Sequence, residues 1–237
     1  MMTPLLETPA DYAAVERLTF AAFETMELPG RTRTDEHYLA HIMRGAAAFV
    51  PELDFVGEIV IDGDSLNPCG EIVANIMYTK SKIVRPDGGE IETLTFGPVS
   101  VKPELHNRGL GAEIIHHSLD RARELGYGAV IIVGHPRYYP RFGFKPAGGY
   151  NLTMPDGAAF DAFMALELAP GYLGADGGEW YEDKVFEIGQ AAFDTWNKTF
   201  QASLLSRQRM SLIKDWNPKQ TALKEAIARS DRQAVTL

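Results

Sequence analysis

Six consecutive residues have the types and spacing of an anion-binding turn at the start of a helix. They are His106, Asn107, Arg108, Gly109, Leu110 and Gly111, and Ala112 follows them. Gly109 and Gly111 have no side chain that would block an approaching anion. The helix expected directly after them presents unpaired backbone N–H groups and a partial positive charge at its first turn. This combination suits a diphosphate group. A glycine pair before a helix is equally typical of close packing, so a second signal is needed.

Two better-known phosphate loops do not fit this turn. A Walker loop ends in Gly-Lys-Ser/Thr, whereas Gly111 is followed by Ala112 and Glu113. A dinucleotide-binding loop has a third glycine where this chain has Ile114. It also needs an acidic residue at the end of the next strand, where this chain has Gly134. The sequence therefore excludes both kinds of nucleotide-binding loop.

The second signal is a pair of tyrosines, Tyr138 and Tyr139, that follows the apolar run 129–133. A residue just beyond the carboxyl end of a parallel strand faces the crevice where such sheets bind ligands. A phenol at this position can donate a proton to a leaving thiolate. Phe142 and Phe144 nearby suit core packing, but two adjacent tyrosines cannot both point to one face. The pair therefore predicts an acid beside the anion-binding turn.

A strand–loop–helix–strand unit must position these groups. Residues 92–101 predict a strand, residues 110–125 a helix, and the run 129–133 a second strand. Five apolar, mostly β-branched residues in a row are typical of a parallel strand covered on both faces. A helical crossover between parallel strands is right-handed by default.

The residues before this unit predict two helices and then an antiparallel meander. The helices are expected from Thr8 to about 27 and from about 34 to 44. The first two strands of the meander are expected at 55–61 and 71–78, on either side of a turn-rich loop at 62–68.

The second expected helix carries His37 and His41, which lie four residues apart on one face. This is metal-ligand spacing, but no glutamate follows His37 and no third ligand is apparent. We therefore expect these histidines at the surface or in a binding cleft rather than at a metal.

The residues after 133 predict a short helical turn over 136–141 and strands at 163–168 and near 180–188. Apolar residues at helical spacing then predict a helix from about 191, which Pro218 breaks. We expect a domain over residues 1–190 and a helical extension over 191–237. The extension would pack on the domain or on a partner subunit.

The composition limits the classes of partner and location. The 237 residues carry a formal net charge of −9, which argues against DNA or an anionic membrane as the main partner. The single cysteine, Cys69, excludes a disulfide framework and a cysteine-based zinc cluster. No signal peptide and no apolar run long enough to span a membrane is visible. These features predict a cytoplasmic protein.

The two signals together resemble the GNAT acetyltransferase superfamily. Its motifs are Gln/Arg-x-x-Gly-x-Gly/Ala and Phe-Tyr-x-x-Leu-Gly-Phe, and the matching stretches here are 106–111 and 138–144. Four further stretches resemble the YhbS-type bacterial branch of that superfamily. They are residues 48–53, 94–99, 121–130 and 134–139, and the resemblance covers roughly residues 8–185.

The resemblance implies an α/β (α+β) fold, a mixed and splayed sheet flanked by helices, with a C-terminal helical extension. It implies acetyl-CoA as the cofactor and direct transfer of the acetyl group to a small-molecule or protein amine. The backbone of Val99 and Val101 would bond the pantetheine arm. The diphosphate would lie on the amides of Asn107, Arg108, Gly109, Leu110, Gly111 and Ala112. Tyr139 would protonate the thiolate. A non-catalytic acyl-CoA-binding protein and an interaction scaffold remain alternatives.

Several residues depart from the superfamily pattern. His106 stands where Gln or Arg is usual, and Gly134 and His135 stand at the strand end where an asparagine is often found. Thr95 stands where histone-modifying members carry a glutamate base, so the base would be Glu92, His135 or a water chain. Apolar residues between 193 and 205 suit burial against either the domain or a second copy, which makes a homodimer one expectation.

Overall fold

The computed structural model describes residues 1–24, 34–59 and 70–214 of the chain. The chain divides into two compact units, Met1–Ile188 and Gly189–Leu237. In the second unit the described part is one helix, α4 (Gln190–Lys214), which confirms the helix expected from about 191. The expected break at Pro218 and the expected loop at 62–68 lie outside the described residues.

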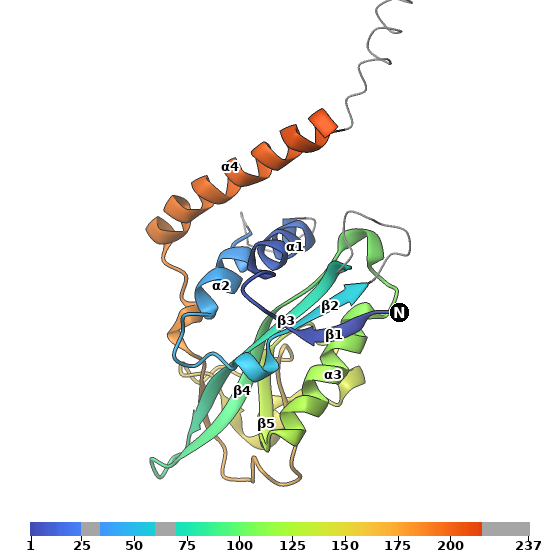
Figure 1. Cartoon of the computed structure of the whole chain (residues 1–237). Helices are drawn as coiled ribbons and strands as arrows, with labels where there is room; N and C mark the ends of the chain where they lie inside the picture. Colours follow the sequence, from blue (N-terminus) through green and yellow to red (C-terminus); the bar gives the residue numbers. More distant parts are fainter. Residues whose placement is uncertain (25–33, 60–69, 215–237) are drawn as a thin grey trace, which may run out of the picture. The chain divides into compact units, whose positions relative to one another are not determined.

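The first half of the sheet is an antiparallel meander with one additional strand at its edge (Figure 1). Its strands are β1 (Thr3–Leu6), β2 (Phe55–Ile59), β3 (Glu71–Val84) and β4 (Glu90–Val101). Each pairs antiparallel with the next, so the meander predicted from the sequence is confirmed. The sequence does not predict β1, because four residues that include a proline give no alternating pattern and suit only an edge.

The second half of the sheet begins at β5 (Ala129–Val133), which is parallel to β4, as predicted. The crossover between them is α3 (Leu110–Glu124). β8 (Phe163–Glu167) and β6 (Lys145–Pro146) continue the sheet beyond β5. The remaining strands are β7 (Leu152–Thr153) and β9 (Gly178–Tyr181), and β9 pairs with both β7 and β3.

A bulge in β4 separates the two halves of the sheet. β5 registers with β4 at Leu94, opposite Val130. Three residues further along, β4 contains one extra residue, so that Gly97 and Pro98 together lie opposite Met77. An extra residue bends its strand, and proline has no N–H for the ladder. β4 therefore diverges from β5 beyond Leu94, which gives the splayed sheet expected for this fold class.

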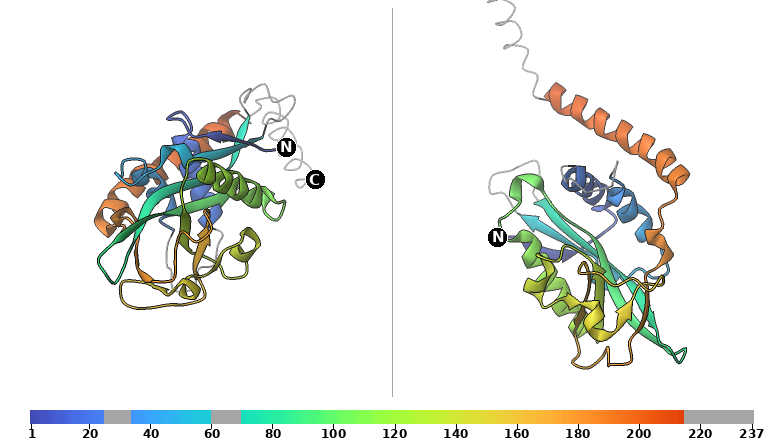
Figure 2. Two further views of the ribbon diagram at one scale, coloured as in Figure 1. Left: turned by 90° about the horizontal axis from the view of Figure 1, so that it is seen from below. Right: turned by 180° about the vertical axis from the view of Figure 1, so that it is seen from behind.

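Helices cover both faces of the sheet (Figure 2). α1 (Tyr12–Glu24) and α2 (Glu36–Met43) lie on one face, and α3 lies on the other. Adjacent residues of β3 show the division, since neighbouring side chains of a strand point to opposite faces. Met77 packs in a cluster with α2, whereas the Tyr78 hydroxyl lies 2.9 Å from the hydroxyl of Ser118 on α3. Among the described helices, none is long and apolar enough to cross a membrane.

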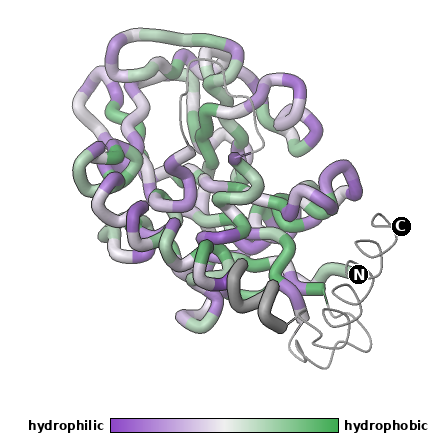
Figure 3. The backbone as a smooth tube through the Cα atoms, turned by 90° about the horizontal axis from the view of Figure 1, so that it is seen from above, coloured by the Kyte–Doolittle hydropathy of each residue, from purple (hydrophilic) through white to green (hydrophobic). Residues whose placement is uncertain are grey.

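The largest hydrophobic cluster lies between α3 and the sheet, with Ile115 and Leu119 of α3 fully covered. Hydrophobic colouring in Figure 3 gathers along the central strands, where this core lies. Val99, Val101 and Tyr139 pack at the edge of the same cluster and are partly buried. The side chains expected to surround a ligand are therefore fixed by the core rather than carried on free loops.

The strand expected near 180–188 is wrong beyond residue 181, so only its first two residues are strand. β9 ends at Tyr181, and Lys184–Phe186 form a 3-10 turn. The Asp183 carboxylate accepts the N–H of Val185 at 2.9 Å, a local bond that competes with strand formation. The helical turn expected over 136–141 is present as the 3-10 turn Tyr139–Phe142.

Candidate active site

The last residues of β4 have backbone groups that no strand pairs on the β5 side. The N–H of Lys102 donates to the carbonyl of Val73 on β3 at 2.8 Å. Along an antiparallel pair, residues that exchange such bonds alternate with residues whose N–H and C=O point the other way. Val101 and Val99 occupy the alternate positions, so their backbone groups point toward the splay. Within the described part of the chain, β5 registers with β4 only at Leu94, which leaves this edge without a partner strand.

The helix after β4 begins without a side-chain cap. Its N-cap residue is Gly109, whose φ of 87° lies in the left-handed region that favours glycine. The first intrahelical bond runs from the N–H of Glu113 to the carbonyl of Gly109 at 3.0 Å. By helix geometry the preceding N–H groups have no intrahelical acceptor; they belong to Leu110, Gly111 and Ala112. Asn107 is also left-handed, with φ 61°, and Arg108 is exposed. The turn presents several N–H donors to solvent.

His106 is turned toward β4 rather than toward the space in front of the helix. Its Nε2 lies 2.8 Å from the carbonyl oxygen of Val101. Because a carbonyl can only accept, Nε2 carries the proton and donates it. The imidazole therefore ties the turn to the end of β4 and occupies the Val101 carbonyl, whereas the N–H of Val101 is not engaged by this contact.

Tyr139 lies among aromatic side chains at the start of its 3-10 turn. Its ring centroid is 5.8 Å from the rings of both Phe96 and Phe144, and 5.2 Å from that of Tyr138. Burial raises the pKa of the Tyr139 phenol to about 12, and the neighbouring Tyr138 adds to the shift. The phenol therefore stays protonated at neutral pH and can serve as a proton donor.

These three parts meet around Gly111. A Cβ on this glycine would lie 3.5 Å from the Val101 side chain and 3.1 Å from the Tyr138 hydroxyl. Tyr138 in turn packs edge-to-face on Tyr139. The end of β4, the start of α3 and the tyrosine pair, which are separate in the sequence, are thus brought into direct contact.

Sequence reasoning missed the role of Gly134 at the end of β5. A Cβ on this residue would lie 2.3 Å from ring carbon Cε2 of Tyr139, closer than any real contact. The glycine is therefore required for the Tyr139 ring to occupy its place. The only signal in the sequence is the glycine itself, where an asparagine is often found.

The two side chains suggested as a base, Glu92 and His135, both have other partners. Glu92 forms an ion pair with Lys80 at 2.9 Å. His135 accepts the backbone N–H of Arg137 on Nδ1 at 3.2 Å. When Nδ1 of a neutral imidazole accepts a hydrogen bond, Nε2 carries the proton and has no free lone pair. In this arrangement neither ring nitrogen of His135 is free to accept a proton from the amine.

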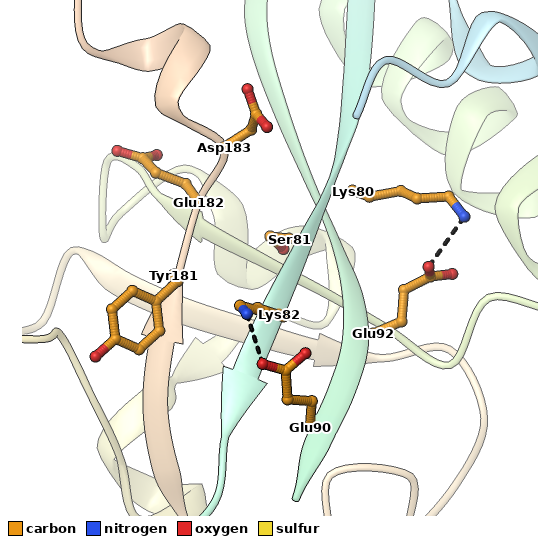
Figure 4. A pocket seen from close by; sticks show the side chains of 8 residues that line it. All are labelled: Lys80, Ser81, Lys82, Glu90, Glu92, Tyr181, Glu182 and Asp183. Carbon is orange, nitrogen blue, oxygen red and sulfur yellow. Dashed lines mark hydrogen bonds and ion pairs between the residues drawn. The ribbon is translucent and has the colours of Figure 1, made fainter. Parts of the chain in front are cut away.

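Glu92 belongs to a surface groove of about 430 Å³ between the β3–β4 hairpin and the end of β9 (Figure 4). The groove is lined by Lys80, Ser81, Lys82, Glu90, Glu92, Tyr181, Glu182 and Asp183. Both of its lysines are paired with glutamates, since Lys82 binds Glu90 at 2.5 Å. None of the residues expected to bind the diphosphate or the pantetheine arm lines it, so this hollow is separate from the site at Gly111.

The two histidines of α2 have different surroundings. His37 is buried, with its ring edge-to-face on Phe20 at 5.0 Å, so it does not lie at the surface. His41 is partly exposed, and its Nδ1 lies 2.9 Å from the carboxylate of Glu16. Across residues 1–24, 34–59 and 70–214, no three potential ligands gather as a metal site would require.

Both a family model and individual relatives match part of this chain to acetyltransferases. The family model described as an acetyltransferase (GNAT) domain matches residues 60–147. The uncharacterized N-acetyltransferase YjhQ of Escherichia coli is 27% identical, over 49% of this chain and 68% of YjhQ. The uncharacterized N-acetyltransferase YhbS of the same organism is 26% identical, over 42% of this chain and 58% of YhbS. The alignment therefore spans less than two thirds of YhbS.

Solved structures share the fold. The E. coli YhbS structure in complex with CoA superposes with a TM-score of 0.64 at 21% identity, covering 79% of this chain and 92% of that one. A GNAT family acetyltransferase from Brucella melitensis in complex with acetyl-CoA gives 0.57 at 24% identity, covering 78% and 98%. The splayed sheet, the uncapped helix after β4 and these sequence matches identify a GNAT acetyltransferase domain over residues 60–147 of this chain.

Proposed function

We propose that this chain transfers the acetyl group of acetyl-CoA directly to an amine. The observation that carries the proposal is the β4 edge at Val99 and Val101, which no strand pairs and which leads to the uncapped start of α3 beside Tyr139. The YhbS and Brucella structures, which contain CoA and acetyl-CoA respectively, support the choice of donor.

The donor would lie along β4 as a short additional strand. Amides of the pantetheine arm would pair with the outward backbone groups of Val99 and Val101, which satisfies polar groups that the splay leaves open. The diphosphate would lie against the N–H groups at the start of α3, where the helix dipole favours negative charge. The donors there are Asn107, Arg108, Gly109, Leu110, Gly111 and Ala112, and His106 would hold the turn to β4.

In the proposed reaction the amine nitrogen attacks the carbonyl carbon of the thioester. Negative charge then develops on the carbonyl oxygen, where the N–H of Val99 would stabilise it. As the new C–N bond forms, the C–S bond breaks, the amine nitrogen loses a proton, and the leaving thiolate takes one from Tyr139. The raised pKa of Tyr139 keeps this proton in place until the thiolate forms.

Distance argues against Glu92 as the base. It stands seven residues before Val99 on an extended strand, a separation of roughly 23 Å. Its carboxylate is also held by Lys80, and His135 already uses its Nδ1 lone pair. We therefore favour the water chain among the three sources of a base that the sequence suggests.

The test uses purified full-length protein, acetyl-CoA and a panel of small and peptide amines. We expect release of free thiol with at least one amine, and Tyr139→Phe to slow that release by 10-fold or more at unchanged affinity for acetyl-CoA. Tyr150→Phe is the matched control, because Tyr150 packs against a different cluster, and its turnover should stay within about twofold of the original.

Two results would contradict this proposal. Equal turnover in Tyr139→Phe and in the unaltered chain removes Tyr139 from the chemistry. Tight binding of acetyl-CoA without thiol release for any amine would instead favour the non-catalytic acyl-CoA-binding protein.

The acceptor is proposed only by class. The net charge of −9 favours a cationic amine, whether a small molecule or a protein side chain or terminus. The homodimer and the cytoplasmic location predicted from the sequence stay predictions. Light scattering of the full chain tests the dimer, for which a particle of twice 26.2 kDa is expected.

A further inference from the structure

A hydroxyl group fills the space that Gly111 leaves open. The Tyr138 oxygen lies 3.1 Å from the position that a Cβ on Gly111 would take. The Cα–Cβ direction in a helix tilts toward the helix N-terminus. The phenol oxygen therefore lies beside the first turn of α3, whose leading N–H groups have no intrahelical acceptor. The absence of a side chain at Gly111 admits this hydroxyl as well as an anion.

Contacts on Tyr138 hold its ring in this place. The Arg141 guanidinium lies 4.4 Å over the ring centroid, and Nε of Arg141 donates to the Tyr138 carbonyl at 3.0 Å. Phe142 packs edge-to-face at 5.4 Å from the other side of the same turn. A ring held by a cation, an aromatic edge and Tyr139 keeps its hydroxyl fixed without any hydrogen bond to that hydroxyl.

The hydroxyl is available to a ligand. Within residues 1–24, 34–59 and 70–214, no hydrogen-bond partner reaches the Tyr138 oxygen, and the residue is only half-buried. Burial raises the pKa of this phenol above its ordinary value, so it carries its proton at neutral pH. A neutral phenol beside the uncapped first turn of α3 adds one more hydrogen-bond donor there.

We propose that Tyr138 is a binding residue for the donor and that its hydroxyl donates a hydrogen bond to a diphosphate oxygen of acetyl-CoA at the start of α3. This inference rests on the proposed function and assigns the two adjacent tyrosines different tasks. Tyr138 recognises the diphosphate, and Tyr139 protonates the sulfur. Tyr138 thereby contributes selectivity for full-length acyl-CoA over thioesters that lack the diphosphate.

The experiment compares acetyl-CoA with S-acetylpantetheine, which keeps the thioester and the pantetheine arm but has no diphosphate. Tyr138→Phe removes only the hydroxyl and keeps the ring on Tyr139 and Arg141. We expect this variant to bind acetyl-CoA 10-fold or more weakly by calorimetry, since a hydrogen bond to a charged group is a strong one. Its KM for S-acetylpantetheine and its kcat with either donor should stay within about threefold.

The outcomes separate this inference from the proposed function. If the unaltered chain does not bind acetyl-CoA, both fail. If it binds acetyl-CoA and Tyr138→Phe binds it equally well, only the role of Tyr138 fails. A variant that loses affinity for both donors to the same extent also overturns the inference, because the hydroxyl would then support the fold of the site rather than the diphosphate.

Discussion

The Tyr139 ring lies directly against the backbone of Gly134, in the space that a side chain at that residue would fill. The tyrosine is predictable, because a phenol after a buried parallel strand matches a known chemical task. The requirement for glycine at Gly134 is not, because it arises only when the chain turns back and lays the Tyr139 ring 2.3 Å from the place of a Cβ. His106 likewise gives no sign in the sequence that it binds the Val101 carbonyl.

A substitution at Gly134 tests this close approach. Gly134→Ala should displace the Tyr139 ring and lower kcat by about 10-fold or more, with affinity for acetyl-CoA changed little, because a small misplacement of a reacting group is costly. Gly149→Ala is the matched control, since a Cβ there would meet no atom within 4 Å. Steady-state kinetics of both variants measure the change in kcat. Equal kcat in Gly134→Ala and the control would show that the ring tolerates the shift.

Among the elements, the long ones follow from sequence pattern and the short ones do not. β5 was predictable to the residue, because an uninterrupted apolar run marks a strand buried on both faces. β6 and β7 have two residues each, so they carry no pattern and exist only because a neighbouring strand offers its edge. The polar half of β3 was also missed, since its pairing with β4 and β9 decides its length.

Buried charges join the ends of several elements, a contact that no local pattern predicts. Arg44 at the end of α2 binds Glu7 after β1 at 2.7 Å, and both side chains are almost fully covered. Asp54, just before β2, lies beside this pair. Burial raises the pKa of Asp54 from 3.8 to about 9, and its hydrogen bond to Glu7 adds to the shift. Asp54 is therefore protonated in the native protein at neutral pH and donates to Glu7.

This shift predicts how stability depends on pH. The pKa of Asp54 is higher in the folded than in the unfolded chain. The stability that Asp54 contributes to the folded chain is therefore complete below pH 3.8 and is lost as pH rises toward 9. Asp54→Asn keeps a donor toward Glu7 and cannot ionise. We expect it to lose less stability between pH 5 and 9 than the unaltered chain, by at least about 1 kcal/mol, the worth of one pKa unit.

Urea unfolding at pH 5, 7 and 9 measures this difference. Asp120→Asn is the control, because the Asp120 side chain is exposed and pairs with Arg123 of its own helix. Parallel pH profiles for Asp54→Asn and the unaltered chain would show that Asp54 is already ionised in the native protein.

For the whole molecule, the parallel strands β4 and β5 with α3 as their crossover were predictable from the sequence. The residue at which β4 and β5 separate was not. The run of residues from Leu94 to Val101 reads as one continuous strand. Only its pairing with β3 reveals the extra residue at Gly97 and Pro98 that bends it away from β5. The open edge beyond this point depends on how β3, β4 and β5 pair with one another. The family resemblance predicted a splayed sheet, whereas the residue pattern of β4 alone did not.

Hydrogen exchange at the two edge amides, Val99 and Val101, measures whether acetyl-CoA completes this open edge of β4. NMR-resolved exchange should show the N–H groups of Val99 and Val101 slowing by 10-fold or more when acetyl-CoA is added, because its thioester carbonyl and pantetheine arm supply the acceptors that β5 does not. The amide of Lys102 already donates to Val73 and should change little. If acetyl-CoA binds and the Val99 and Val101 amides exchange as fast as before, the donor does not bind along this edge of β4.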